Sequence, residues 1–258
     1  MPLPAGWIVP DWPAPPNVHA VCSTREGGVS SGPFASLNLG DHVGDEARAV
    51  AGNRQRFRTA IEARPVFMRQ VHGSAVAELT PATVDGIQAD ACMTRSRGVA
   101  CTIMVADCLP VLFATADGAF VGAAHAGWRG LAGSNGEGVL DAACRVLWAA
   151  SGASAAQTLA WLGPCIGPDA FEVGPEVKAA FESAEPATAA LFRPGREGKW
   201  LADLPGLARR RLQALGLARV HGNDSSTGWC TVANPSRFFS HRRDRGVSGR
   251  FAAAIWRA

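Results

Sequence analysis

The sequence contains no tyrosine and only two lysines, Lys178 and Lys199, so arginine carries almost all of its positive charge. The net charge is only +3, and no long run of basic residues is present. A nucleic-acid-binding or membrane-binding surface would need such a cluster. We therefore expect neither a nucleic acid nor a membrane as a partner.

Long apolar runs are also missing, since none approaches the roughly 20 residues of a membrane-spanning helix. The first residues, MPLPAGWIVPDWPAPP, have neither a basic start nor an apolar core, so we expect no signal peptide. Their prolines indicate an extended leader over residues 1–20.

The seven cysteines include no CxxC pair and show no regular spacing. An odd number in this pattern argues against a disulfide framework, so we expect all of them to be unpaired and the location to be cytoplasmic.

Hydrophobic residues make up 47% of the chain and charged residues 18%, which is typical of a globular protein. With no internal repeat or low-complexity linker, residues 1–258 are expected to form one domain. Residue patterns favour helices at 45–62, 136–150, 174–183 and 204–216, and strands at 66–71, 99–106, 158–162 and 251–256. Arg64-Pro65 is expected to end the first helix. The mixed order without steady strand–helix alternation predicts an α+β fold with mixed sheets layered with helices.

Two apolar runs at 109–115 and 119–125 flank Ala116-Asp117-Gly118, and Asp-Gly between apolar runs is a strong hairpin signal. With Asp117 and Gly118 as the turn residues, Pro110 lies opposite His125. Strand alternation then places Cys108 on the same face as His125.

Three short motifs, QVHG, ADCLP and HAGWRG, each place a metal-binding side chain where a strand meets a turn: His72, Cys108 and His125. Two imidazoles and one thiolate suit zinc, and three ligands leave the fourth position open. Such a site keeps a net positive charge that can acidify a bound water. Another interpretation of the same residues makes Cys108 a nucleophile and His125 its base.

The motifs RQVHG, ADCLPVLF, HAGWRG, GPCIGPDAFEVG and FFSHRRD-GVSGR, with TREGGVSSGPFASLNLGDHVGD near the start, resemble those of the YfiH family. The resemblance runs from about Thr24 to the C-terminus. Members of that family were long described as laccase-domain or multicopper polyphenol oxidases. The resemblance implies a zinc-dependent purine nucleoside phosphorylase that converts adenosine, inosine, guanosine or methylthioadenosine with phosphate to the base and ribose 1-phosphate. It also implies adenosine deaminase activity and one zinc ion held by His72, Cys108 and His125.

Two features depart from the family pattern. Phe171 and His241 stand where members often have tyrosine, which argues against a phenolic hydroxyl in the site. The stretch Ser134–Glu137 looks like a small insertion that could reshape the mouth of the cleft.

Phosphorolysis needs a phosphate-binding group, and arginine suits this task. Arg129, just after the Gly127 turn, is the preferred candidate, with Arg54 and Arg242 behind it. Deamination needs a carboxylate to move a proton, and Asp107 and Glu172 are the candidates. Strand alternation would turn Asp107 away from the metal.

Two other functions compete with the purine enzyme. A copper-dependent phenol oxidase would need many histidines, whereas the chain has six and only two of them lie in these motifs. A cysteine hydrolase or amidase acting on cell-wall peptides would use Cys108 and His125 without a metal. A pure binding module is least favoured, because it would leave an open metal site without a use.

Overall fold

The computed structural model describes residues 3–134 and 136–258, and two β-sheets that face one another form its centre. The first sheet has the strand order β1 (Val18–Cys22), β13 (Phe251–Arg257), β5 (Val99–Val105) and β2 (Arg64–Phe67). The second sheet has the order β12 (Arg219–Gly222), β8 (Thr158–Leu162), β6 (Leu109–Thr115), β7 (Val121–Ala126), β4 (Ala91–Thr94) and β3 (Val76–Glu78). Each sheet contains parallel and antiparallel pairs, so the predicted mixed α+β architecture is confirmed.

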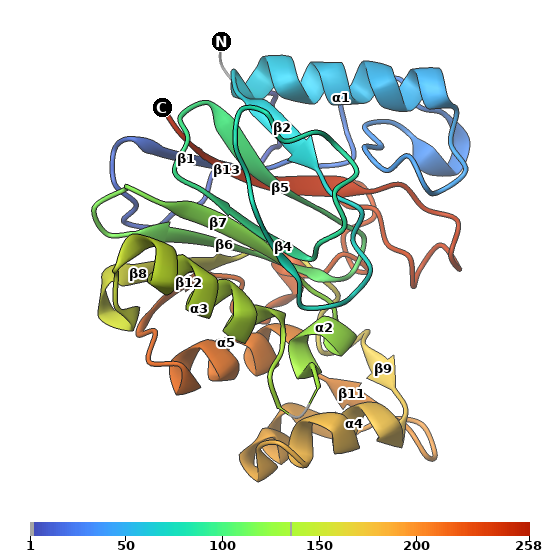
Figure 1. Cartoon of the computed structure of the whole chain (residues 1–258). Helices are drawn as coiled ribbons and strands as arrows, with labels where there is room; N and C mark the ends of the chain where they lie inside the picture. The colour runs from blue at the N-terminus through green and yellow to red at the C-terminus, as the bar shows by residue number, and fades with distance from the viewer. Residues whose placement is uncertain (1–2, 135) are drawn as a thin grey trace.

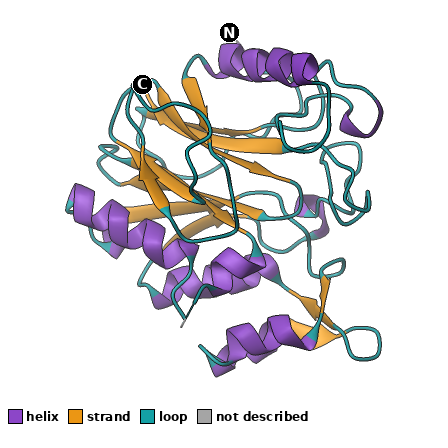
Figure 2. Cartoon of the chain, turned by 45° about the vertical axis from the view of Figure 1, so that its right-hand side comes forward, coloured by secondary structure: helices purple, strands orange, loops and turns teal. Residues whose placement is uncertain are grey.

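Helices cover the outer face of each sheet, which gives four layers in the order helix, sheet, sheet, helix (Figure 1). The helices are α1 (Ala47–Ile61), α2 (Trp128–Ala132), α3 (Val139–Ser151), α4 (Pro175–Glu182) and α5 (Leu204–Ala214). Helix α1 packs on the first sheet, and α3 and α5 pack on the second (Figure 2). Short 3-10 turns lie at Gly32–Phe34, Ala155–Gln157, Pro186–Leu191 and Thr227–Trp229.

The layering explains why the central strands are apolar without alternation. In β13, Phe251 and Ile255 pack between the two sheets, whereas Ala252 and Ala254 pack toward α1. Both faces of the strand are therefore buried, as expected of a strand inside a covered sheet.

The predicted hairpin is confirmed in its register. β6 and β7 pair so that Pro110 lies opposite His125, and the turn is centred on Asp117 and Gly118. Gly118 has a φ of +66°, a conformation that glycine adopts without strain. The turn thus brings Cys108, just before β6, beside the end of β7.

The strand predicted at 66–71 differs from β2 at both ends. Helix α1 ends at Ile61, before Arg64-Pro65, and Pro65 lies inside β2 instead of ending the helix. Proline is tolerated there because β2 is an edge strand. β2 stops at Phe67, and beyond it the side-chain amide of Gln70 donates to the carbonyl of Met104 at 2.8 Å and accepts its N–H at 2.9 Å.

A small three-stranded sheet and α4 form an appendage below α2 (Figure 1). Its strands are β10 (Phe192–Pro194), β11 (Trp200–Ala202) and β9 (Glu172–Val173). At the other end of the chain, the expected leader is shorter than residues 1–20, because β1 begins at Val18. Residues 1–2 lie outside the described residues.

Across the described ranges, no helix is both long and apolar enough to cross a bilayer. All seven cysteines are unpaired, and all except Cys108 are buried.

Candidate metal centre

His72, Cys108 and His125 meet at one end of the two sheets, where the chain crosses from β5 to β6. His72 lies in the loop after β2, Cys108 directly precedes β6, and His125 lies near the end of β7. One potential ligand atom from each of the three lies within 4.8 Å of the others. Residues 36 and 17 positions apart in sequence therefore share one site, as their motifs predict.

The spacing of the donors fits a zinc ion. The Cys108 Sγ lies 3.7 Å from the His72 Nε2. Tetrahedral zinc with ordinary Zn–N and Zn–S bonds would separate a nitrogen from a sulfur by about 3.5 Å. The rings of His72 and His125 are inclined at 65°, with centroids 4.7 Å apart, so the two imidazoles approach the site from different directions.

Asp90 holds both histidines in place. This fully buried carboxylate lies directly before β4, and its Oδ1 is 2.9 Å from the His125 Nδ1, which leaves His125 Nε2 free for a metal. The backbone N–H groups of Val71, His72 and Gly73 also donate to Asp90, at 3.1, 2.8 and 2.8 Å. A carboxylate behind a histidine ligand fixes its tautomer and its ring orientation.

Gly127 is required by the close approach of two ligands. A Cβ at this position would lie 2.9 Å from the Cys108 Sγ and 2.9 Å from the His72 Cδ2. Its φ of −68° is open to any residue, so the constraint is space rather than backbone conformation. The glycine of the HAGW motif thus makes room for the ligand cluster.

The electrostatics of the cluster favour a thiolate. Burial opposes ionisation of Cys108, but the charge and hydrogen bond of His125 and the hydrogen bond of His72 lower its pKa to about 6. Burial likewise opposes the charged form of His125, whereas Cys108 and Asp90 raise its pKa to about 9. Without a metal the two form a thiolate–imidazolium pair, and with a metal the thiolate is ready to coordinate.

A cavity of about 160 Å³ opens beside the three residues. His42, Gln70, His241 and Arg250 also line it. Burial lowers the pKa of Arg250 from its usual value, while the charges of Cys108 and Asp107 partly offset this effect. Among the described residues no carboxylate forms an ion pair with Arg250, so its charge is available to an anion in the cavity.

Sequence reasoning missed Asp90 and Arg250. Asp90 is an acid placed directly before a fully buried strand, and such a group needs partners. Arg250 belongs to the GVSGR motif and directly precedes β13. Both signals were present in the sequence, although the partners lie far away along the chain.

Asp107 adopts a φ of +87° at the crossing point and braces the C-terminal loop. Its Oδ1 accepts a hydrogen bond from the Thr231 hydroxyl at 2.5 Å, and its Oδ2 accepts one from the Arg242 backbone N–H at 2.6 Å. Both oxygens are therefore engaged in holding the loop.

The remaining candidate residues lie around the site but do not line the metal cavity. Glu172 is paired with Arg196 at the surface of the appendage. Arg129 is exposed and stacks on Trp128, with its guanidinium 4.5 Å from the ring centroid. Arg242 donates to the carbonyl of Glu172 at 3.0 Å.

Arg54 does not line the metal cavity. It lines a neighbouring hollow that shares His42 and Gln70 with that cavity. It donates to the carbonyl of Leu39 at 2.9 Å, pairs with Asp41 at 3.1 Å and stacks on Phe67.

The two departures from the family pattern lie apart from one another. Phe171 is buried below Arg242, whereas His241 is exposed and lines the metal cavity. In the 134–137 stretch, the backbones of Ser134 and Glu137 pair with each other, and Asn135 lies outside the described residues.

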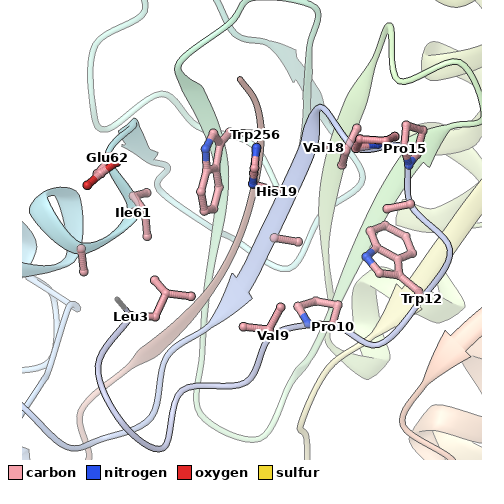
Figure 3. Close-up of a pocket in the computed structure, with 14 residues that line it drawn as sticks. Leu3, Val9, Pro10, Trp12, Pro15, Val18, His19, Ile61, Glu62 and Trp256 are labelled. Atoms are coloured by element: carbon pink, nitrogen blue, oxygen red, sulfur yellow. The ribbon is translucent and has the colours of Figure 1, made fainter. Parts of the chain in front are cut away.

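A separate hollow of about 370 Å³ lies between the leader and β1, where His19 stacks on Trp256 (Figure 3). Trp12, Pro10 and Pro15 of the leader form its other wall. This hollow has no part of the histidine–cysteine cluster in its lining.

Comparison with known proteins agrees with the resemblance of the motifs. A family model described as multi-copper polyphenol oxidoreductase laccase matches residues 19–258. The chain is 49% identical to a purine nucleoside phosphorylase of Pseudomonas aeruginosa, over 97% of this chain and 98% of that protein. It is 45% identical to the purine nucleoside phosphorylase YfiH of Escherichia coli, over 96% and 98% of the two chains.

Solved structures share the fold. A crystal structure of a Neisseria meningitidis protein superposes with a TM-score of 0.89 at 43% identity, covering 98% of this chain and 99% of that one. YlmD from Geobacillus stearothermophilus also gives a TM-score of 0.89, at 30% identity, over 100% and 98% of the two chains. The chain therefore belongs to the multi-copper polyphenol oxidoreductase laccase family, and similar proteins include the purine nucleoside phosphorylase YfiH.

Proposed function

We propose that this protein is a zinc-dependent purine nucleoside phosphorylase that also deaminates adenosine. The observation that carries the proposal is the cluster of His72, Cys108 and His125 beside a cavity, with Asp90 bonded to the ring of His125 and to the backbone of His72. The names of the similar proteins support the phosphorylase activity. We infer zinc from the donor set. We infer the deaminase activity, and the substrates adenosine, inosine, guanosine and methylthioadenosine, from the family resemblance.

When bound by two neutral imidazoles and one thiolate, zinc supplies a Lewis acid with one uncompensated positive charge. In phosphorolysis the bond between C1′ of the ribose and the purine nitrogen breaks, and a phosphate oxygen bonds to C1′. Two electrostatic needs follow: the phosphate must be held, and negative charge on the departing purine must be stabilised.

Arg250 is our preferred phosphate-binding group, because it lines the metal cavity and carries a charge that no carboxylate pairs among the described residues. The guanidinium matches the geometry of a phosphate. Arg54 lines the neighbouring hollow, whereas Arg129 and Arg242 line neither, so these three would act only by favouring the approach of an anion.

Deamination exchanges the C6 amino group of adenosine for an oxygen from water, and a side chain must move the proton to the departing ammonia. His42 lines the cavity, and burial followed by the charge of Arg250 lowers its pKa, with Asp41 opposing this effect. A neutral imidazole at pH 7 can accept a proton. We therefore prefer His42 for this role over Asp107 and Glu172, whose carboxylates are held by Thr231 and Arg196.

One observation favours a second function. A thiolate–imidazolium pair between Cys108 and His125 is also the arrangement of a cysteine hydrolase. His72, close to the same sulfur, favours the metal site, because a simple cysteine–histidine pair does not need a second imidazole.

Substitution of Cys108→Ala tests the main function, and nucleoside turnover by the zinc-loaded wild-type protein separates it from the cysteine hydrolase. We expect the variant to lose zinc, phosphate-dependent release of hypoxanthine from inosine, and conversion of adenosine to inosine, all together. Cys144→Ala is the matched control, since it removes a buried thiol from α3 and should keep all three properties. A Cys108→Ala protein without zinc but with full nucleoside turnover would contradict the proposal. A zinc-loaded wild-type protein that converts no purine nucleoside would favour the cysteine hydrolase.

A further inference from the structure

Beyond the metal cavity lie two further hollows along α1. The first, of about 260 Å³, shares His42 and Gln70 with the metal cavity. The second, of about 440 Å³, shares Arg54 and Phe67 with the first. The three hollows therefore lie next to one another in a row, from the metal ligands to the space between α1 and the loop at 81–85.

Arginine dominates the outer part of this row of hollows, which we call the arginine groove. It is defined by Arg54, Arg58, Arg64 and Arg69. Arg54 and Arg58 come from α1, Arg64 comes from β2, and Arg69 follows β2 in the chain (Figure 1). Helix α1 and the edge of the sheet beneath it thus bring four cationic groups to one groove.

Most of this charge is uncompensated. Arg54 pairs with the exposed Asp41 at 3.1 Å. Arg64 donates to the carbonyls of Thr80 and Thr83, both at 2.8 Å, and Arg69 donates to the neutral amide of Gln88.

Within the residues that the structure describes, Arg58, Arg64 and Arg69 form no ion pair with a carboxylate. Asp85 also lines the groove, and its Oδ1 accepts the backbone N–H of Phe67 at 3.0 Å. The groove therefore carries a net positive charge and suits an anion.

The small volume of the metal cavity indicates which kind of anion could occupy both the cavity and the groove. A volume of about 160 Å³ is below the roughly 300–1,000 Å³ of typical small-molecule sites. A ligand larger than this volume projects out of the metal cavity, and the hollow beyond His42 and Gln70 adjoins it. Phosphates on the 5′ oxygen of a nucleoside in the metal cavity would then lie toward the arginines of the adjoining hollows.

We propose that the arginine groove binds the 5′-phosphates of a purine nucleotide whose nucleoside part occupies the metal cavity. This inference rests on the proposed function for the position of the nucleoside. It extends the ligand class of the site from nucleosides to nucleoside 5′-phosphates, as substrates or as competing ligands. Guanidinium groups bind phosphate through charge-assisted hydrogen bonds, and the fields of several of them in one groove add together.

The test compares inosine, inosine 5′-monophosphate and inosine 5′-diphosphate by titration calorimetry on the zinc-loaded protein without free phosphate, so that phosphorolysis cannot proceed. Arg58→Gln is the test variant, because Arg58 makes no contact with the metal ligands and carries no backbone-bracing hydrogen bond in the described part of the chain. Arg56→Gln is the matched control. It removes the same charge two positions earlier on α1, roughly on the opposite side of the helix, and outside the groove.

We expect the diphosphate to bind at least roughly tenfold more tightly than inosine at low salt, as one or two charge-assisted contacts provide. Arg58→Gln should remove most of that difference and leave inosine binding unchanged, and Arg56→Gln should change neither. High salt should weaken the diphosphate alone.

Equal affinities of inosine and its diphosphate would overturn the proposal, as would equal losses in the two variants. Pyrophosphate binding as tightly as the diphosphate, with the same loss in Arg58→Gln, would assign the groove to free phosphates and overturn the nucleotide. The proposed function fails separately: the wild-type protein would then release no hypoxanthine from inosine and phosphate, whatever the groove binds.

Discussion

Replacing Asp90 by asparagine removes the charge behind the metal centre while keeping the shape of the side chain. In the wild-type protein each carboxylate oxygen accepts two hydrogen bonds: Oδ1 from the His72 N–H and the His125 Nδ1, and Oδ2 from the Val71 and Gly73 N–H groups. The amide nitrogen of asparagine cannot accept any of them. Whichever oxygen it replaces, two donors lose their acceptor.

The size of the effect follows from these four bonds. A hydrogen bond to a charged group contributes about 1.5–3 kcal/mol. Val71 is 46% exposed, so water can replace part of what the loop loses, and the lower end of the range applies. Two such losses give about 3 kcal/mol of unfolding free energy. Because His125 also loses its charged partner, zinc affinity should fall by about 10–100-fold.

The assay is zinc competition against a chelating dye, with thermal unfolding in parallel. Cobalt substitution adds a spectroscopic readout, because a disordered ligand set changes the visible absorption of the bound cobalt, which a remote loss of stability does not. Asp85→Asn is the matched control, since it swaps an exposed carboxylate that accepts one backbone N–H. An Asp90→Asn protein with wild-type zinc affinity and stability would contradict the role assigned to Asp90.

Two further predictions concern the same centre. Gly127→Ala should weaken zinc binding roughly tenfold or more, because the added Cβ would lie 2.9 Å from atoms of Cys108 and His72 and overpacking costs about 1–3 kcal/mol. Gly52→Ala in α1 is the control: its added Cβ meets its nearest neighbour at 3.4 Å, so the zinc affinity should stay unchanged. Thiol titration of the denatured, unreduced protein should find all seven cysteines free, and in the native metal-free protein Cys108 should react with iodoacetamide far faster than the others. The rate of alkylation of Cys108 should fall as the pH drops through about 6, because that is the lowered pKa of its thiol. Bound zinc should protect Cys108. Cys144 should react slowly, because burial raises its pKa to about 12. A second cysteine reacting as fast, or fewer than seven free thiols, would contradict this prediction.

The sequence predicts those parts of the molecule that local chemistry determines. The hairpin register follows from Asp117-Gly118 and the two-residue period of a strand, and it places Cys108 near His125 without long-range information. The helices at 45–62 and 204–216 are recognisable because their apolar residues repeat at helical spacing.

What the sequence does not predict depends on contacts between distant segments. The pairing of β13 with β1 and β5 joins the C-terminus to two earlier segments, and no local pattern specifies it. Asp90 could be recognised as an acid before a buried strand, yet its partners, His125 and the loop at 71–73, become known only once the sheets are assembled. The surroundings of the metal centre therefore depend on tertiary structure, whereas its three ligands can be recognised from their own motifs.

We propose that one zinc, held by His72, Cys108 and His125, supports phosphorolysis of purine nucleosides. Titration of the metal-free protein with zinc, while hypoxanthine release from inosine is followed in phosphate buffer, tests it most directly. We expect activity to rise linearly, to level off at one zinc per chain, and not to appear when copper replaces zinc. A metal-free protein that is already fully active, or activity restored only by copper, would contradict it.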